Sequence, residues 1–226
     1  MTLDPKRRLI IFDVDGTLID SQADILAAMS AAFAVANVDM PQRDVVLGIV
    51  GLSLPQAFAA LAPNAAPDLR TRMVSAYKEA YAEARITAMQ DQIAPLFAGM
   101  RNLLNALSEQ DAVTLAVATG KSRRGLDALL EGHGLTPFFA STQVADNHPS
   151  KPHPSMVMAA LDETGHDAAQ AVMIGDTSFD MEMAQAAGVR GIGVTWGYHP
   201  QGRLAAAHQI VGSSDALGQA LTGWMA

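Results

Sequence analysis

The stretch Ile11-Phe12-Asp13-Val14-Asp15-Gly16-Thr17-Leu18 places two carboxylates one residue apart at the end of an apolar run. Like charges this close repel each other, and the glycine that follows allows the chain to turn sharply. In extended backbone, residues two apart point to the same side, so Asp13 and Asp15 are expected to face one reactant. Taken alone, the five residues from Asp13 to Thr17 also fit an Asp-Gly hairpin turn.

The composition suits one large domain, or a core domain that carries a smaller inserted one. The chain has 226 residues, half of them apolar, and a net charge of −8. An acidic balance argues against a nucleic-acid partner, which would need a basic face. No cysteine is present, so disulfides and thiolate metal sites are excluded. Without a signal peptide or an apolar run near the roughly 20 residues of a membrane span, we expect a cytoplasmic monomer or weak homodimer with no membrane partner.

Short apolar runs alternate with helical patterns over most of the chain. Several of these runs lack polar alternation, which is typical of parallel strands covered on both faces. The pattern predicts an α/β fold with a doubly wound parallel sheet, in which the first strand is central, the second and fourth flank it, and the third and fifth lie outside them. The expected strands are residues 9–12, 112–118, 137–141, 171–174, 189–194 and, as a short sixth, 209–211.

One segment of about 70 residues breaks this alternation, because residues 21–92 contain no convincing strand. Alanine, leucine and methionine are frequent there, and prolines separate the helical patterns. A helical insertion after the first strand is the simplest account. We therefore expect a core domain of residues 1–19 and 93–226 and an inserted helical domain of residues 20–92. The helices expected in it are residues 21–36, 42–47, 54–61 and 68–84.

Reactive side chains follow four of the expected strands. In open α/β sheets, ligands bind at the carboxyl ends of the strands. The convergence of four loops on one edge favours a site there over the isolated hairpin turn. The residues are Asp13 and Asp15 after the first strand, Thr119 and Gly120 after the second, Lys151 after the third, and Asp176 and Asp180 after the fourth.

These residue types suit transfer of a phosphoryl group. A carboxylate is already ionised at pH 7, and its attack on phosphorus gives an aspartyl-phosphate. A second acid can protonate the leaving oxygen and later deprotonate water. Because several acids and a phosphate repel one another, the site needs cations. Mg²⁺ is the expected cofactor, since it binds carboxylate, water and phosphate oxygens. Lys151 adds a fixed positive charge, and the Thr119 hydroxyl with nearby backbone N–H groups can bind phosphate oxygens.

Four motifs, in order, give the chain a family resemblance. They are "DVDGTLIDS" from Asp13, "VATGKS" around Thr119, Lys151 in "SKPHP", and "GDTSFDM" from Gly175. With these motifs the sequence resembles the haloacid dehalogenase superfamily of phosphotransferases, in its phosphoglycolate phosphatase-like branch. The resemblance implies a Rossmann-like core, and the helical insertion between the first two motifs matches the helical cap of that family.

The resemblance also implies a role for each matched residue. Asp13 would be the nucleophile and a Mg²⁺ ligand. Asp15 would be the general acid and base, with its backbone carbonyl on the metal. For Asp180 the family role, ordering water or Lys151 from outside the metal ligands, competes with that of a charge at a helix N-terminus. The remaining implied roles are Mg²⁺ ligation by Asp176 and binding of the phosphoryl group by Thr119 and Lys151.

Two glycines near the expected site raise questions. Gly120 stands where relatives often have asparagine, so a side-chain contact near the leaving group would be missing. Gly51, in the loop of residues 48–53, either approaches the substrate or marks a turn. This loop carries no arginine or lysine. The carboxylate of phosphoglycolate would therefore need a cation from elsewhere, such as Arg43 or Lys78.

Other candidate residues have structural explanations that we prefer. Ser21 and Asp24 fit a capping box at the first inserted helix. His148 and His153 flank Lys151, but prolines and the lack of cysteine favour a surface loop over a metal site. Residues 196–198 could line the mouth of the site, yet packing is the preferred role for them.

The resulting prediction is Mg²⁺-dependent hydrolysis of a small phosphorylated metabolite, a phosphate monoester, through an aspartyl-phosphate. A phosphomutase of the β-phosphoglucomutase type is the alternative, because it uses the same two aspartates. A phosphate-binding protein without activity is a second alternative, but no catalytic residue of the motifs is missing. Dehalogenase chemistry needs no acid at the second position, and Asp15 argues against it.

Overall fold

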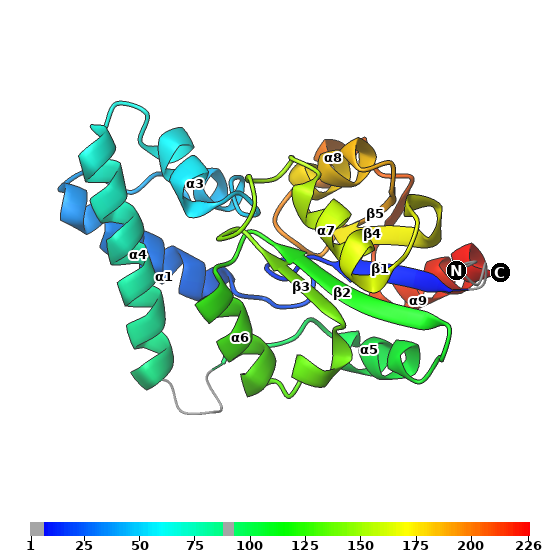
Figure 1. Ribbon diagram of the computed structural model, residues 1–226. Helices are drawn as coiled ribbons and strands as arrows, with labels where there is room; N and C mark the ends of the chain where they lie inside the picture. The colour runs from blue at the N-terminus through cyan, green and yellow to red at the C-terminus, as the bar shows by residue number, and fades with distance from the viewer. Residues whose placement is uncertain (1–6, 88–92) are drawn as a thin grey trace.

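The computed structural model describes residues 7–87 and 93–226. Its centre is a parallel six-stranded sheet in the order β3-β2-β1-β4-β5-β6 (Figure 1). The first strand lies between the second and the fourth, so the predicted strand order and fold class are confirmed. The strands are β1 (Arg8–Phe12), β2 (Val113–Thr119), β3 (Ser141–Val144), β4 (Ala171–Gly175), β5 (Arg190–Val194) and β6 (Gln209–Val211).

Apolar residues on both faces of β1 explain why this strand is central. Ile10 and Phe12 belong to the hydrophobic core on one face of the sheet. Leu9 and Ile11 belong to the core on the other face. Because side chains alternate along a strand, an uninterrupted apolar run fits only a position that is covered on both sides.

The third strand was predicted wrongly, at residues 137–141. Thr136–Phe138 forms a short 3-10 helix, and β3 runs from Ser141 to Val144. Pro137 fits the start of a helical turn because its φ is fixed and its missing N–H is not needed there. β3 itself carries two polar side chains, Ser141 and Gln143. Both donate hydrogen bonds to Glu163, at 2.7 and 2.8 Å.

Helices cover both faces of the sheet. Met156 of α7 and Met183 of α8 join the core that contains Leu9, whereas Leu104 of α5 and Leu217 of α9 join the core that contains Phe12. The last helix, α9, was not among the predicted helices, although its apolar residues recur at helical spacing. The helices outside the insertion are α5 (Met100–Ser108), α6 (Arg123–Gly132), α7 (Ser155–Thr164), α8 (Ser178–Ala186) and α9 (Ser214–Met225), with short 3-10 turns at Ala168–Gln170 and Gln201–Arg203.

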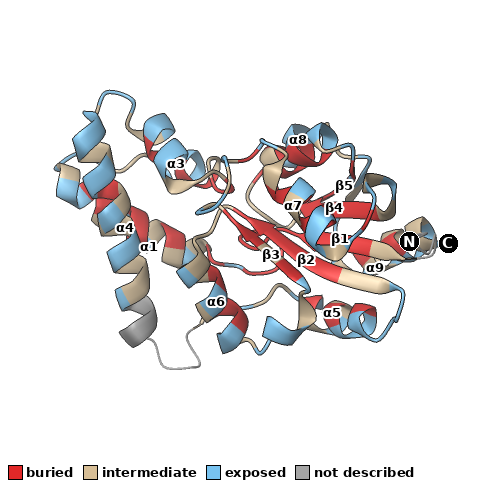
Figure 2. Ribbon diagram, viewed as in Figure 1, coloured by how far each residue is buried: buried red, intermediate tan, exposed pale blue. Residues whose placement is uncertain are grey.

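Of the described helices between β1 and β2, the first four, α1 to α4, lie apart from the sheet, at one end of the molecule (Figure 1). They have a core of their own, in which Phe33, Phe58 and Met73 are buried. Figure 2 shows buried stretches on these helices. The predicted helices are thus present, while residues 88–92 of the predicted insertion lie outside the described residues. The helices are α1 (Gln22–Ala36), α2 (Arg43–Leu47), α3 (Leu54–Leu61) and α4 (Pro67–Thr87).

The two connections to these helices run side by side. The Phe97 N–H donates to the Leu18 carbonyl, and the Asp20 N–H donates to the Pro95 carbonyl, both at 2.9 Å. The chain therefore leaves the sheet and returns to it at one place, next to the acidic end of β1.

Candidate active site

The carboxyl edge of the sheet brings the predicted site residues together. Asp13 follows β1, and its N–H donates to the Ile174 carbonyl of β4 at 2.9 Å. Thr119 is the last residue of β2, and Asp176 follows β4 directly. Asp180 lies in the first turn of α8. Because these strands are parallel, residues far apart in the sequence meet at the same edge.

Lys151 joins two of the acids. Its ammonium group donates to Asp13 Oδ1 at 2.7 Å and to Asp180 Oδ1 at 2.6 Å, and all three side chains are buried. Burial alone would lower the pKa of Lys151, but the two carboxylates raise it above its usual value. Lys151 is therefore a fixed positive charge.

Asp180 serves two purposes, one with each carboxylate oxygen. Oδ1 accepts from Lys151, while Oδ2 accepts from the Thr177 N–H at 3.0 Å and from the Thr177 hydroxyl at 2.7 Å. The bond from the Thr177 N–H, together with the Asp180 N–H donating to Thr177 Oγ1 at 3.3 Å, forms a capping box at the start of α8. The two roles considered for Asp180 thus occur together: it orients Lys151 and it caps a helix.

Asp176 is held in a tight space. The Thr17 hydroxyl donates to its Oδ1 at 3.1 Å, and the Tyr198 N–H donates to its Oδ2 at 2.7 Å. A Cβ atom at Gly16 or Gly197 would lie 2.3 or 2.2 Å from Asp176 Oδ2. Gly16 also has a φ of 86°, a conformation that other residues rarely adopt. The glycine after Asp15 is therefore required both by the turn and by the neighbouring carboxylate.

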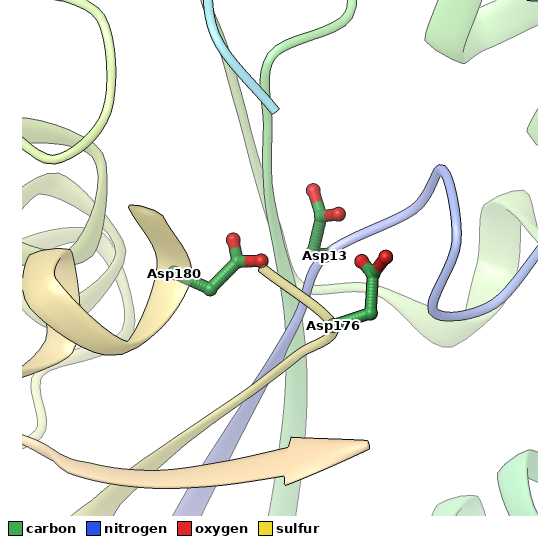
Figure 3. A group of neighbouring side chains, drawn as sticks. All are labelled: Asp13, Asp176 and Asp180. Carbon is green, nitrogen blue, oxygen red and sulfur yellow. The ribbon is translucent and has the colours of Figure 1, made fainter. Parts of the chain in front are cut away.

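Three of the acids form a group whose charges are not balanced. Asp13, Asp176 and Asp180 each offer a carboxylate oxygen, and these oxygens lie within 4.8 Å of one another (Figure 3). Burial, together with the charges of Asp180 and Asp15, raises the pKa of Asp13 to about 7, although Lys151 opposes the shift. Burial and the charges of Asp13 and Asp180 also raise the pKa of Asp176.

A hard divalent cation fits this group of acids. Asp13 Oδ2 is buried and has no hydrogen-bond partner among the described residues. Buried polar atoms without a partner are rare and call for an explanation. Oxygen ligands and surplus negative charge are what Mg²⁺ prefers in proteins. The donor set is therefore suitable for the predicted metal.

Asp15 lies outside this group, with partners that the sequence analysis did not identify. Lys121 Nζ donates to its two carboxylate oxygens at 2.7 and 2.9 Å, and also contacts the Tyr81 hydroxyl at 2.9 Å. Ser21 Oγ donates to Asp15 Oδ1 as well. The predicted capping role of Ser21 is wrong, because its side chain makes no cap hydrogen bond. Lys121 stands within "VATGKS", but its partner on α4 could not be read from that motif.

A pocket of about 530 Å³ opens beside Asp13 and Asp15. Thr119, Gly120 and Gly51 also line it. Lys151, Asp176 and Asp180 are buried and are not among its lining residues. Of the four aspartates that the motifs supply, Asp13 and Asp15 therefore face the pocket, and Asp146 lines it as well.

The loop of residues 48–53 contacts the core next to the pocket. A Cβ atom at Gly120 would lie only 2.6 Å from the Gly51 carbonyl oxygen. Ser53 N–H donates to Ser150 Oγ at 2.8 Å, and His199 Nε2 donates to the Gly48 carbonyl at 3.0 Å. The space that a side chain at Gly120 would need is thus filled by this loop.

The remaining candidates have structural roles. His148 bonds Ser155 Oγ at 2.8 Å and Gln143 Oε1 at 2.9 Å, so both ring nitrogens are engaged within its own loop region. Trp196 packs against the sheet core and donates to the Thr17 carbonyl at 3.1 Å. Packing was the preferred role for this residue, and the structure agrees.

The two cations considered for a substrate carboxylate differ in position. Arg43 is exposed and pairs with Asp44 at 2.8 Å. Lys78 lines the pocket, with Asp146 as a partner at 3.9 Å.

Comparison with known proteins agrees with the geometry. A family model described as "Haloacid dehalogenase-like hydrolase" matches residues 10–194. A probable phosphatase of Dickeya dadantii, IndB, is 36% identical over 220 residues, which cover 92% of this chain and 94% of the relative. A phosphoglycolate phosphatase of Agrobacterium fabrum is 33% identical, covering 88% and 84%. A pyrophosphatase of Bacillus pumilus, PpaX, is 31% identical, covering 83% and 82%.

Solved structures show the same architecture. A haloacid dehalogenase-like family protein of Streptococcus pneumoniae superimposes with a TM-score of 0.81 at 25% identity, covering 99% of this chain and all of the other. A predicted phosphatase of Clostridium acetobutylicum reaches a TM-score of 0.84 at 24% identity, covering 96% and 99%. Within residues 7–87 and 93–226, no helix has the length and apolar character needed to cross a membrane.

Proposed function

The chain belongs to the haloacid dehalogenase-like hydrolase family, and we propose that it is a Mg²⁺-dependent phosphatase acting on small phosphate monoesters. One observation carries the proposal. Asp13 faces the pocket with one oxygen bonded to Lys151 and the other without a hydrogen-bond partner among the described residues, and a second carboxylate, that of Asp15, faces the same pocket. This arrangement suits a nucleophile beside a proton donor. The names of the curated relatives, which include phosphatases, support it.

Asp13 and Asp176, with the backbone carbonyl of Asp15, would hold Mg²⁺ in this proposal. The bound ion would supply positive charge that balances the buried carboxylates and the phosphate. Asp180 would contribute indirectly by orienting Lys151, since its own two oxygens are engaged by Lys151 and Thr177.

In the first step, a carboxylate oxygen of Asp13 attacks the phosphorus atom. The bond from phosphorus to the ester oxygen breaks, and protonated Asp15 gives its proton to the leaving alcohol. The Lys151 ammonium group and the Thr119 hydroxyl would bind the phosphoryl oxygens during the transfer. The products of this step are the free alcohol and an aspartyl-phosphate on Asp13.

In the second step, Asp15 takes a proton from water, and the resulting hydroxide attacks the phosphorus atom. The bond to Asp13 breaks, inorganic phosphate leaves, and Asp15 is protonated again. The helices of residues 20–92 would act as a cap in both steps. Their loop at Gly51 already lies against Gly120, and in this proposal the contact would help to exclude water.

Rapid-quench trapping of labelled protein tests these roles. Asp13→Asn should abolish turnover and accumulate no label. Asp15→Asn should lose both proton transfers, so that an activated aryl phosphate, whose leaving group needs little protonation, rescues phosphorylation but not breakdown of the phosphoenzyme. Asp20→Asn is a matched control, because Asp20 is exposed and close in sequence. Label on Asp13→Asn, or equal rescue of both variants, would contradict the assigned roles.

A further inference from the structure

The pocket beside Asp13 is larger and more apolar than a two-carbon substrate requires. Its volume of about 530 Å³ lies within the range of roughly 300–1,000 Å³ found for sites that enclose drug-sized ligands. We infer that the substrate is a phosphate monoester whose organic group is uncharged, apolar and about the size of an aromatic ring. This inference rests on the proposed function, because it assumes that the phosphate is bound at Asp13.

Apolar side chains from several separate elements form the walls. Most of the apolar lining comes from the inserted helices and their loop, and Ala128 of the core joins it. An apolar group of the substrate would gain roughly 25 cal/mol for each Å² that it removes from water. The lining side chains include Ile25 and Met29 of α1, Val50 and Leu52 of the loop, Leu54 of α3 and Ala128 of α6.

Two tyrosines add aromatic rings to the lining of the pocket. The rings of Tyr77 and Tyr81 are stacked, with centroids 6.0 Å apart and an angle of 18° between their planes. Both rings line the pocket. The Tyr81 hydroxyl is within 2.9 Å of Lys121 Nζ, which holds this ring at one orientation. Tyr77 and Lys121 Nζ, which is 4.7 Å from the Tyr81 centroid, already lie over the Tyr81 ring. An aromatic group on the substrate could pack against the edges of these rings.

Of the cations that line the pocket, Lys121 and Lys78 have carboxylate partners, whereas Arg124 is exposed and has no ion pair among the described residues. Lys121 is paired with Asp15, and its side chain is only 8% exposed. Lys78 is 49% exposed and lies 3.9 Å from Asp146. Arg124 lines the pocket from an exposed position on α6. A substrate carboxylate placed among the apolar walls would therefore lose its water without gaining a close partner, which is unfavourable.

A comparison of three substrates tests the inference. Benzyl phosphate, methyl phosphate and 2-phosphoglycolate all release an alcohol, but only the first carries an apolar ring and only the last a carboxylate. We expect kcat/KM for benzyl phosphate to exceed that for either of the others by on the order of 100-fold. A preference for 2-phosphoglycolate would mean that a cation of the pocket, such as Lys78 or Arg124, binds the carboxylate, and it would overturn the inference.

A variant that narrows the pocket provides a second test. Ala128→Leu should reduce the ratio of the benzyl to the methyl kcat/KM about tenfold, because the added side chain occupies space that the ring needs. Ala106→Leu is the matched control, since Ala106 is exposed on α5 and is not a lining residue. An unchanged ratio in Ala128→Leu would contradict the assignment of the ring to this pocket.

Binding to the inactive Asp13→Asn variant separates this inference from the proposed function. Calorimetry should give tighter binding of benzyl phosphate than of methyl phosphate. If the wild-type enzyme hydrolyses all three esters at similar rates, the proposed function stands and the inference fails. If none is hydrolysed but benzyl phosphate still binds more tightly, the proposed function fails while the apolar pocket is supported. Equal binding of the two esters would overturn the inference.

Discussion

Gly120→Ala should disable the site through a single added methyl group. The new Cβ atom would lie 2.6 Å from the Gly51 carbonyl oxygen and 2.9 Å from the Leu52 carbonyl oxygen. Ordinary van der Waals contact begins at 3.4 Å, so the backbone at Gly120 or the backbone at Gly51 must move away by about 0.8 Å. Gly120 is fixed at the end of β2 next to Thr119, and we expect the loop of residues 48–53 to move.

The displaced loop also forms part of the pocket. Val50, Gly51 and Leu52 line it, and Ser53 is hydrogen-bonded to the core through Ser150. Because a misplacement of about 1 Å can cost on the order of 100-fold in rate, we expect kcat/KM to fall by roughly that factor. Overpacking of this kind should also reduce the free energy of unfolding by about 1–3 kcal/mol.

The assay measures phosphate release under steady-state conditions, with urea unfolding as the stability measurement. Gly223→Ala is the matched control, since a Cβ atom at that position meets no atom within 4 Å among the described residues. A Gly120→Ala enzyme with kcat/KM within twofold of the wild-type value would refute the argument that the contact between loop and core positions the site.

Three further predictions follow from the contacts at the site. EDTA should abolish turnover and Mg²⁺ should restore it, whereas Ca²⁺ should inhibit because its looser coordination suits in-line attack poorly; full turnover in metal-free buffer would contradict this. Ser21→Ala should leave Asp15 with one hydrogen bond fewer and shift the pH profile of kcat more than it changes KM. An unchanged pH profile would show that the bond from Ser21 to Asp15 does not affect the proton transfers. Burial and Arg203 lower the pKa of His199, whose Nδ1 accepts from the Ser178 N–H. The free energy of unfolding should therefore be constant above about pH 6.5 and decline at lower pH, where the unfolded chain binds more protons. In urea unfolding, the free energy of unfolding of His199→Asn should depend less on pH than that of the wild-type protein.

Much of the fold follows from local patterns in the sequence. The buried strands are continuous apolar runs, and the expected order around β1 is the one observed. The third strand was misplaced because its own residues, Ser141 to Val144, include polar side chains that are satisfied by Glu163 on α7. That partner lies 20 residues or more along the chain, so its effect cannot be seen in a short window of sequence.

The sequence by itself determined that Asp13, Asp15, Thr119 and Asp176 would converge, because the ends of parallel strands share one edge whatever the details of packing. Only the tertiary structure decided the partners of Asp15. Lys121 reaches Asp15 across 106 positions and Tyr81 across 40, and Ser21 bonds Asp15 instead of capping its own helix. Such contacts depend on how the inserted helices pack against the core. Periodicity and spacing describe the faces of single elements, and they contain no information on which faces meet.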